Sequence, residues 1–353
     1  MLLGHDPILD RFRRTLRAGR LASTFLFVGL PGIGKKSFAL QLAQGLLCDR
    51  RPEEALDPCG QCPACAQVLA GTHPDVVVVQ KPADKNIIPV ELFIGDKDHR
   101  MREGLCHDIS LRPYSGRRKI AVIDDADFLN QEGANALLKT LEEPPPKSLL
   151  ILIGTSEQRQ LPTIRSRCQV VRFSPLAEAD VASLLLSTGA CSDPQLAAQA
   201  AALSGGSLAK ALQWCDEDFL AFRATLYEQL SQREFDLPPL AKTVTSFVEA
   251  AGKDAAQKRA RMREVLTMGL DFHQHLIAIL TGSAPSSSPD PALQAAVATT
   301  ARWWPGDAES AAACVETSLD ALSHVDANAN LTTLAEWWLD ELSQSARSGL
   351  ATR

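Results

Sequence analysis

Short apolar runs alternate with helical patterns through the first half of this chain. Five runs have the length and the nearly unbroken apolar character of strands that are buried in a parallel sheet, and they lie at residues 25–28, 75–79, 120–123, 149–153 and 170–173. Apolar residues at helical spacing separate these runs, as in residues 8–20, 38–47 and 130–142. Strands that alternate with helices in this way predict a parallel sheet that helices cover on both faces.

The pattern changes in the second half, where apolar residues recur at helical spacing. Residues 250–275 and 308–326 are the clearest examples. We therefore expect residues 216–353 to form an all-helical domain of their own. A chain of 353 residues is long enough for two or three domains, each with its own core.

The first apolar run leads into a glycine-rich segment. Gly29, Gly32, Gly34 and Lys35 fit the G-x-x-x-x-G-K pattern of a phosphate-binding loop. The backbone N–H groups of such a loop surround a phosphate, the following helix N-terminus adds favourable electrostatics, and Lys35 would reach the terminal phosphates. Lys36, however, stands where the pattern places the Ser or Thr hydroxyl that binds Mg²⁺. We therefore predict a phosphate-binding loop with weak affinity for ATP and a poor site for Mg²⁺.

The third apolar run ends in acidic residues. Four apolar residues followed by Asp124 form a Walker B pattern, in which the first Asp orients Mg²⁺ or its water. Asp125 follows at the position where related ATPases place a Glu that activates water. A buried strand that ends in turn-forming acids would look the same in isolation. The phosphate-binding loop upstream favours the Walker B interpretation.

The cysteines give the sharpest local signal. Cys59, Cys62 and Cys65 form two overlapping C-x-x-C spacings, and Cys48 lies at the end of a predicted helix just upstream. Four thiolates can hold a tetrahedral Zn²⁺, and the intervening Pro and Gly supply the turns that a zinc knuckle needs. The alternative is four unrelated reduced cysteines in a loop. No general base is apparent beside this cluster, so the predicted zinc is structural.

Composition and charge narrow the class of protein. Hydrophobic residues make up 45% of the chain and charged residues 22%, which is ordinary for a globular protein. The formal net charge of −6 argues against a protein that coats nucleic acid through its overall field. We find neither the ~18 uninterrupted apolar residues of a membrane span nor the basic and apolar regions of a signal peptide. These features predict a cytoplasmic protein without membrane association.

Several motifs together identify a family. Their residues are 29–34, 48–65, 71–75, 134–145 and 164–168. In this combination the sequence resembles the AAA+ clamp-loader subunits, densely from residue 4 to residue 215. The resemblance implies partners: a hetero-pentameric ring of loader subunits that uses ATP to open a sliding clamp and place it on primed DNA.

The same resemblance implies a fold and its division along the chain. Residues 1–175 would form an α/β AAA+ P-loop domain around a parallel sheet, with the zinc knuckle inserted at residues 48–65. Residues 176–215 would form a helical lid. Residues 216–353 would form an all-α collar through which the ring oligomerises.

Two site residues are also carried over by motif. Thr155 matches sensor 1, which reads the γ-phosphate, and Arg167 of the Ser-Arg-Cys motif matches an arginine finger that acts on the neighbouring subunit's nucleotide. A guanidinium suits that role because it offers bidentate hydrogen bonds to phosphate oxygens and a delocalised charge. The alternative for Arg167 is a surface arginine paired with a carboxylate.

Departures from the family pattern shape the functional hypothesis. Ala209 stands where active members carry the sensor 2 arginine, and Lys210 comes one residue late. With Lys36, this favours a structural subunit that supplies Arg167 to a neighbour and has little or no ATPase activity. The alternative is an ATP-hydrolysing motor subunit of the same loader. A zinc-dependent nucleic-acid-binding protein with a vestigial P-loop is a third hypothesis, and the acidic net charge counts against it.

Overall fold

The chain divides into two compact units, Met1–Leu212 and Gln213–Arg353. The computed structural model describes residues 3–82, 85–233, 236–283, 290–304 and 307–348. The sheet belongs to the first unit, and the part of the second unit that the structure describes is helical. The division into three parts, with sheet and lid separated near residue 175, stays a prediction.

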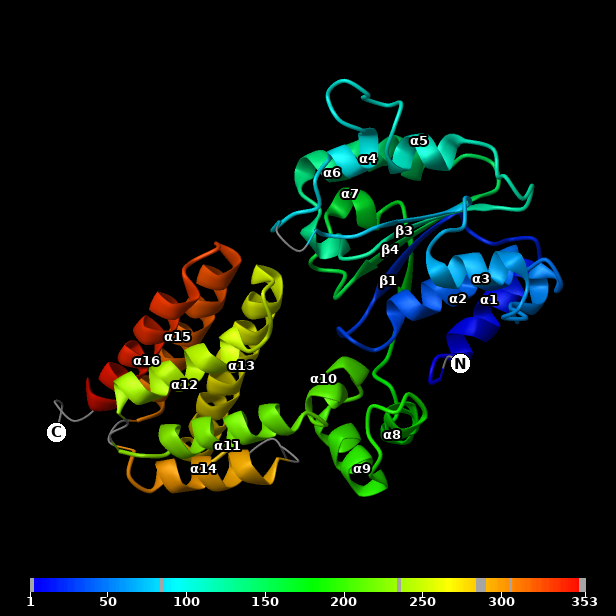
Figure 1. The fold of residues 1–353 in the computed structure, drawn as a ribbon. Helices are drawn as coiled ribbons and strands as arrows, with labels where there is room; N and C mark the ends of the chain where they lie inside the picture. The colour runs from blue at the N-terminus through cyan, green and yellow to red at the C-terminus, as the bar shows by residue number, and fades with distance from the viewer. Residues whose placement is uncertain (1–2, 83–84, 234–235, 284–289, 305–306, 349–353) are drawn as a thin grey trace. The chain divides into compact units, whose positions relative to one another are not determined.

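Five parallel strands form one sheet in the order β2-β3-β4-β1-β5 (Figure 1). Their bounds are β1 Thr24–Val28, β2 Val76–Val79, β3 Lys119–Ile123, β4 Ser148–Gly154 and β5 Gln169–Arg172. Each predicted apolar run contributes one strand, so the predicted parallel sheet is confirmed. The prediction that the second run is fully buried is wrong. Because β2 lies at an edge of the sheet with a neighbour on one side only, Val78 is 38% exposed.

Helices cover both faces of this sheet (Figure 1). One face carries α1 Asp6–Arg17, α2 Lys35–Leu47 and α3 Pro63–Ala70, and the other carries α4 Glu91–Ile94, α5 Leu105–Ser110 and α6 Gln131–Glu142. The shorter connecting elements are η1 Glu53–Ala55, η2 Ala126–Phe128 and α7 Pro162–Arg165. Alternate residues of β1 enter the two cores: Phe25 and Phe27 pack with α1 and α2, whereas Leu26 and Val28 belong to the opposite core.

The strand order brings three loops to one edge of the sheet. β4 pairs with β1 on one side and with β3 on the other, and in register Val28 pairs with Gly154 and Ile123 with Leu152. The C-terminal ends of parallel strands open at the same edge. The segments that follow Val28, Ile123 and Gly154 therefore meet there, although they are far apart in the sequence.

Three helices follow the sheet within the first unit. They are α8 Glu178–Ser187, α9 Pro194–Leu203 and α10 Leu208–Gln213, of which only the final residue, Gln213, belongs to the second unit. α8 and α9 pack together, and each buries one apolar face, with Val181 and Leu185 on α8 and Ala197 and Ala201 on α9. α10 begins where the chain returns to the glycine-rich loop.

In the part that the structure describes, the second unit consists of helices around one hydrophobic core. They are α11 Glu217–Leu230, α12 Leu237–Glu249, α13 Ala255–Leu280, α14 Pro291–Ala301, α15 Ala308–Asp326 and α16 Leu331–Ser348. Trp338 is fully buried, and its indole nitrogen donates to Ser318 Oγ at 3.1 Å. The indole lies so close to α13 that a Cβ on Gly269 would come within 2.4 Å of it. Glycine is therefore required at position 269 for this packing.

The all-helical fold predicted for this half of the chain is confirmed for the residues that the structure describes. One helix begins at Ala255 and not at residue 250, because Asp254 caps it by accepting a hydrogen bond from the Ala256 N–H at 3.0 Å. None of the helices in the described ranges is both long enough and apolar enough to cross a membrane.

Candidate phosphate-binding and metal sites

The glycine-rich loop has a backbone conformation that favours glycine at three positions. Gly29, Gly32 and Gly34 all have positive φ, at 152°, 74° and 93°. A Cβ on Gly29 would also lie 2.6 Å from the carbonyl oxygen of Phe173, so this position has no room for a side chain. α2 begins at Lys35, directly after the loop, and its N-terminus faces the cavity that the loop lines. That end of a helix carries unpaired N–H groups and favours anions.

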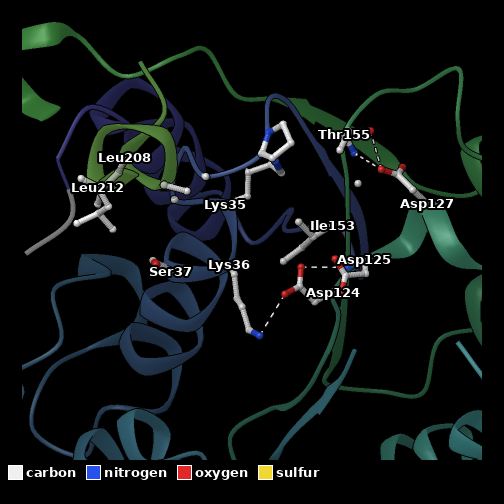
Figure 2. Close-up of a pocket in the computed structure, with 15 residues that line it drawn as sticks. Lys35, Lys36, Ser37, Asp124, Asp125, Asp127, Ile153, Thr155, Leu208 and Leu212 are labelled. Atoms are coloured by element: carbon white, nitrogen blue, oxygen red, sulfur yellow. Dashed lines mark hydrogen bonds and ion pairs between the residues drawn. The ribbon is translucent and has the colours of Figure 1, made fainter. Parts of the chain in front are cut away.

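The loop lines a cavity of about 440 Å³ at the edge where the three strand ends meet. Lys35, Lys36, Asp124, Asp125 and Thr155 all line it, so the structure brings these predicted residues together (Figure 2). Three residues of the lid segment also line it, namely Leu208, Ala209 and Leu212. Lys210 is exposed and does not line the cavity.

The two lysines have different partners. Lys35 is buried, and its Nζ donates to the carbonyl oxygens of Gly29 and Leu30 at 2.7 and 2.6 Å. Burial lowers the pKa of Lys35, and the charges of Asp127 and Asp124 oppose that effect. A phosphate in the loop would have to replace these carbonyl bonds to reach the ammonium.

Lys36 points to Asp124, the acid of the predicted Walker B pattern, and its side chain stays 40% exposed (Figure 2). Its Nζ lies 3.1 Å from Asp124 Oδ2 and donates to Gln80 Oε1 at 2.6 Å. The other oxygen of Asp124 accepts the N–H of Asp125 at 3.1 Å. Both oxygens of Asp124 are therefore engaged. Gln80 was missed at the level of sequence, although it directly follows the run at residues 75–79.

Asp127 is a second residue that the sequence did not single out. Its Oδ2 accepts hydrogen bonds from the N–H and the hydroxyl of Thr155 at 2.8 and 2.6 Å, and its Oδ1 accepts one from Gln160. Figure 2 shows Thr155 turned toward Asp127. The hydroxyl predicted to read a γ-phosphate is thus committed to a neighbouring carboxylate.

Asp125, predicted to stand where related ATPases place a Glu, has a left-handed backbone conformation. Its φ is 57°, in the left-handed region that few residues other than Gly, Asn and Asp adopt. Burial, and then the charge of Asp124, raise the pKa of Asp125. The buried site and the neighbouring carboxylate thus make the ionised form of this acid less favourable than it is for an Asp in water.

The lid segment rests directly on the loop. The N–H of Leu208 donates to the Gly32 carbonyl at 3.0 Å, and the Ser207 hydroxyl donates to the Pro31 carbonyl at 2.9 Å. A Cβ on Gly32 would come within 2.5 Å of the Ala209 methyl group. The small residue at position 209 therefore permits this close approach, and no cation is present there to meet a phosphate.

The four predicted cysteine ligands lie together in a separate cluster. Cys48 follows α2, Cys62 caps α3, and the sulfur atoms of Cys48, Cys59, Cys62 and Cys65 all lie within 4.8 Å of one another. Four thiolates around one Zn²⁺, each at about 2.3 Å, would be about 3.8 Å apart. The Cys59 and Cys65 sulfur atoms are 4.0 Å apart. These donors fit a tetrahedral metal such as zinc.

Backbone N–H groups prepare this cluster for a cation. The N–H groups of Cys62 and Cys65 point at the sulfur atoms of Cys59 and Cys62, each at 3.4 Å. Hydrogen bonds from the backbone, foremost that of Gln61, lower the pKa of the Cys59 thiol to about 6, whereas burial raises that of Cys65 to about 12.

Arg167 lies outside the cavity and pairs within its own chain. Its guanidinium forms an ion pair with Glu142, the last residue of α6. This is the carboxylate pairing that the sequence analysis left open as the alternative for Arg167. Glu142 was not recognised as its partner beforehand, although it belongs to the motif at residues 134–145.

The first unit is similar to subunits of DNA polymerase III. Residues 4–177 match the family described as DNA polymerase III, delta subunit. The DNA polymerase III subunit delta' of Pseudomonas aeruginosa is 34% identical over 229 residues, which cover 64% of this chain and 66% of that protein. The Escherichia coli subunit of the same name is 32% identical over 225 residues, 64% of each chain. The matched region thus spans slightly less than two thirds of either relative.

A related subunit with a different name also matches. The Escherichia coli DNA polymerase III subunit tau is 33% identical over 168 residues, which cover 47% of this chain and 24% of that protein.

Proposed function

Because this chain belongs, through residues 4–177, to the DNA polymerase III delta subunit family, we propose a role for it in DNA replication. The chain would be a structural subunit of the clamp loader, the complex that places a sliding clamp on primed DNA. The relatives named subunit delta' support this assignment. The partners in this proposal are the other subunits of a hetero-pentameric ring and, through the ring, the clamp and the DNA. It also places the protein in the cytoplasm, with the polymerase.

The contact between Lys36 and Asp124 supports a role other than that of a motor. A P-loop ATPase holds Mg²⁺ between a loop hydroxyl and the Walker B carboxylate. In this chain an ammonium takes the place of the hydroxyl and lies 3.1 Å from that carboxylate. Two further contacts also argue against a motor. The Thr155 hydroxyl is bonded to Asp127, and the methyl group of Ala209 lies over the loop where a cation would otherwise meet phosphate. The chain's own site would bind ATP weakly and hydrolyse it little or not at all.

We assign Arg167 the role of an arginine finger for a neighbouring subunit. The assignment is supported by the Ser-Arg-Cys motif and by the chemistry of a guanidinium beside a phosphate. The position of Arg167 outside this chain's cavity agrees with action on another subunit's nucleotide.

The cysteine cluster would hold one structural zinc ion. Cys48, Cys59, Cys62 and Cys65 supply all four ligands, which leaves no open position for a substrate. When bound, zinc would cross-link the end of α2 to the start of α3. The ion would therefore stabilise the fold and take no part in the hydrolysis of ATP.

A motor subunit of the same loader remains the second candidate, because a relative named subunit tau matches part of this chain. Reconstitution separates the two. Purified chain is mixed with the other loader subunits, clamp and primed DNA, and both clamp loading and ATP turnover are measured. Loading that requires the chain, with no turnover by the chain alone, is the expected result. Robust turnover by the isolated chain would support the motor.

A further inference from the structure

The guanidinium of Arg167 is almost fully occupied within its own chain. Its Nε donates to Glu142 Oε1 at 2.8 Å, and its Nη2 donates to the same oxygen. Its Nη1 donates to the Thr163 carbonyl at 2.9 Å and to Ser166 Oγ at 3.1 Å. An arginine has five N–H donors, so these four bonds leave one. A finger in this state cannot offer the bidentate hydrogen bonds that a phosphate requires.

The backbone beneath this side chain is firmly held. The Arg167 carbonyl accepts the hydroxyl of Thr24 at 2.7 Å, and its N–H donates to the Ile164 carbonyl at 3.1 Å. Thr24 is buried and is the first residue of β1, the strand that leads into the glycine-rich loop. Only the side chain of Arg167 is therefore free to change its partners.

Helix stability does not explain an acid at position 142. Glu142 ends α6, where the partial negative charge of the helix C-terminus disfavours a carboxylate. The pair is also open to solvent, with side chains that are 31% exposed for Arg167 and 50% for Glu142. Exposed pairs are weak. A phosphate carries more negative charge than one carboxylate, so it can displace Glu142 from the guanidinium.

We propose that Glu142 is a positioning residue that holds Arg167 back until the γ-phosphate of a neighbouring subunit's nucleotide takes its place. The inference rests on the proposed finger role of Arg167. In the free chain the carboxylate neutralises the finger. In the assembled ring the γ-phosphate displaces Glu142 from the Arg167 guanidinium only when the neighbour's nucleotide is close. Hydrolysis of ATP without clamp and DNA therefore stays low.

The test is Glu142→Gln in the reconstituted loader, with Glu142→Ala as a second variant that cannot accept the hydrogen bonds. Glu143→Gln is the matched control, because Glu143 is an exposed acid beside Glu142 with no ion pair to Arg167. ATP turnover is measured without and with clamp and primed DNA. We expect both Glu142 variants to raise the basal rate up to about fivefold, the factor equivalent to about 1 kcal/mol. The stimulated rate and the control should stay unchanged.

The double variant Glu142→Gln/Arg167→Ala separates the two proposals. Its basal rate should equal that of Arg167→Ala, because the carboxylate acts only through the arginine. Unchanged basal rates in both Glu142 variants, or a lower stimulated rate, would overturn the inference about Glu142. The finger role of Arg167 would still be supported if Arg167→Ala lowered the rate of ATP turnover. No effect of Arg167→Ala at all would overturn the finger role itself.

Discussion

Lys36 Nζ lies 3.1 Å from Asp124 Oδ2, so a side chain from the start of α2 neutralises the acid that follows β3. This ion pair between two residues far apart in the sequence thereby occupies the position at which a P-loop ATPase binds its metal. Two unit positive charges about 4 Å apart repel by about 4 kcal/mol at an effective dielectric constant of 20, and Mg²⁺ carries two such charges. The ammonium of Lys36 therefore opposes the binding of Mg²⁺ beside Asp124.

The first prediction concerns this pair. The isolated chain should show no Mg²⁺-dependent hydrolysis of ATP in a single-turnover experiment. Lys36→Thr should restore a hydroxyl, free Asp124 and make nucleotide binding stronger with Mg²⁺ than with a chelator. Lys36→Arg, which keeps the charge, is the control and should behave like the unchanged chain. Efficient Mg²⁺-dependent turnover by the unchanged chain would contradict the prediction.

The second prediction concerns Arg167. Arg167→Ala should lower hydrolysis at the neighbouring subunit's site by a factor of about 10³–10⁵, the usual effect of losing an arginine finger. The total rate of a loader with several ATP sites should fall less. Arg165→Ala is the matched control, because Arg165 is an exposed arginine of the same segment. If both variants assemble and turn over ATP alike, Arg167 is not a finger.

The third prediction concerns the metal. Protein purified without chelator should contain one Zn²⁺ per chain by elemental analysis. Cys62→Ser should lose the ion and destabilise the segment between α2 and α3, while circular dichroism still reports a folded sheet. Cys191→Ser replaces a buried cysteine outside the cluster and should retain the zinc. A zinc content near zero in the unchanged protein would rule out the site.

The fourth prediction concerns Asp127. Asp127→Asn should lower the free energy of unfolding in urea by about 1–3 kcal/mol. The amide oxygen can replace only one of the two carboxylate oxygens, so the donors of either Thr155 or Gln160 would face an NH₂ group that cannot accept their hydrogen bonds. Stability equal to that of the unchanged chain would show that these hydrogen bonds are dispensable.

Asp125→Asn, a change at a neighbouring acid, should raise the free energy of unfolding, whereas Asp127→Asn should lower it. Because the pKa of Asp125 is raised in the folded chain, its protonated form stabilises the fold below its ordinary value of 3.8. That contribution is lost as the pH rises through the raised pKa, so at pH 7 the carboxylate opposes folding. The variant should therefore be more stable at pH 7, and the gain should vanish below about pH 4. Asn also tolerates the left-handed backbone at this position.

Features that depend on neighbours along the chain could be predicted from the sequence. The apolar runs predict the strands because a buried parallel strand needs apolar residues on both faces. Glycines at 29, 32 and 34 predict the loop because its backbone needs positive φ there. The cysteine spacing predicts the cluster because short turns bring Cys59, Cys62 and Cys65 to one point. The exposure of β2 was missed, because strand order decides which strand lies at an edge.

Some residues of the site could not be recognised from the sequence, because no local pattern marks them. Gln80, Asp127 and Glu142 each stand in a segment that predicts only a strand end or a helix end. They acquire partners because parallel pairing of β3, β4 and β1 brings distant loops to one edge, and because α6 ends beside the segment of Arg167. The sequence by itself therefore determined which candidate groups for phosphate and metal this protein carries. Only the fold decided that Lys36, Thr155 and Arg167 already have carboxylate partners, since charges pair by distance in space and not along the chain.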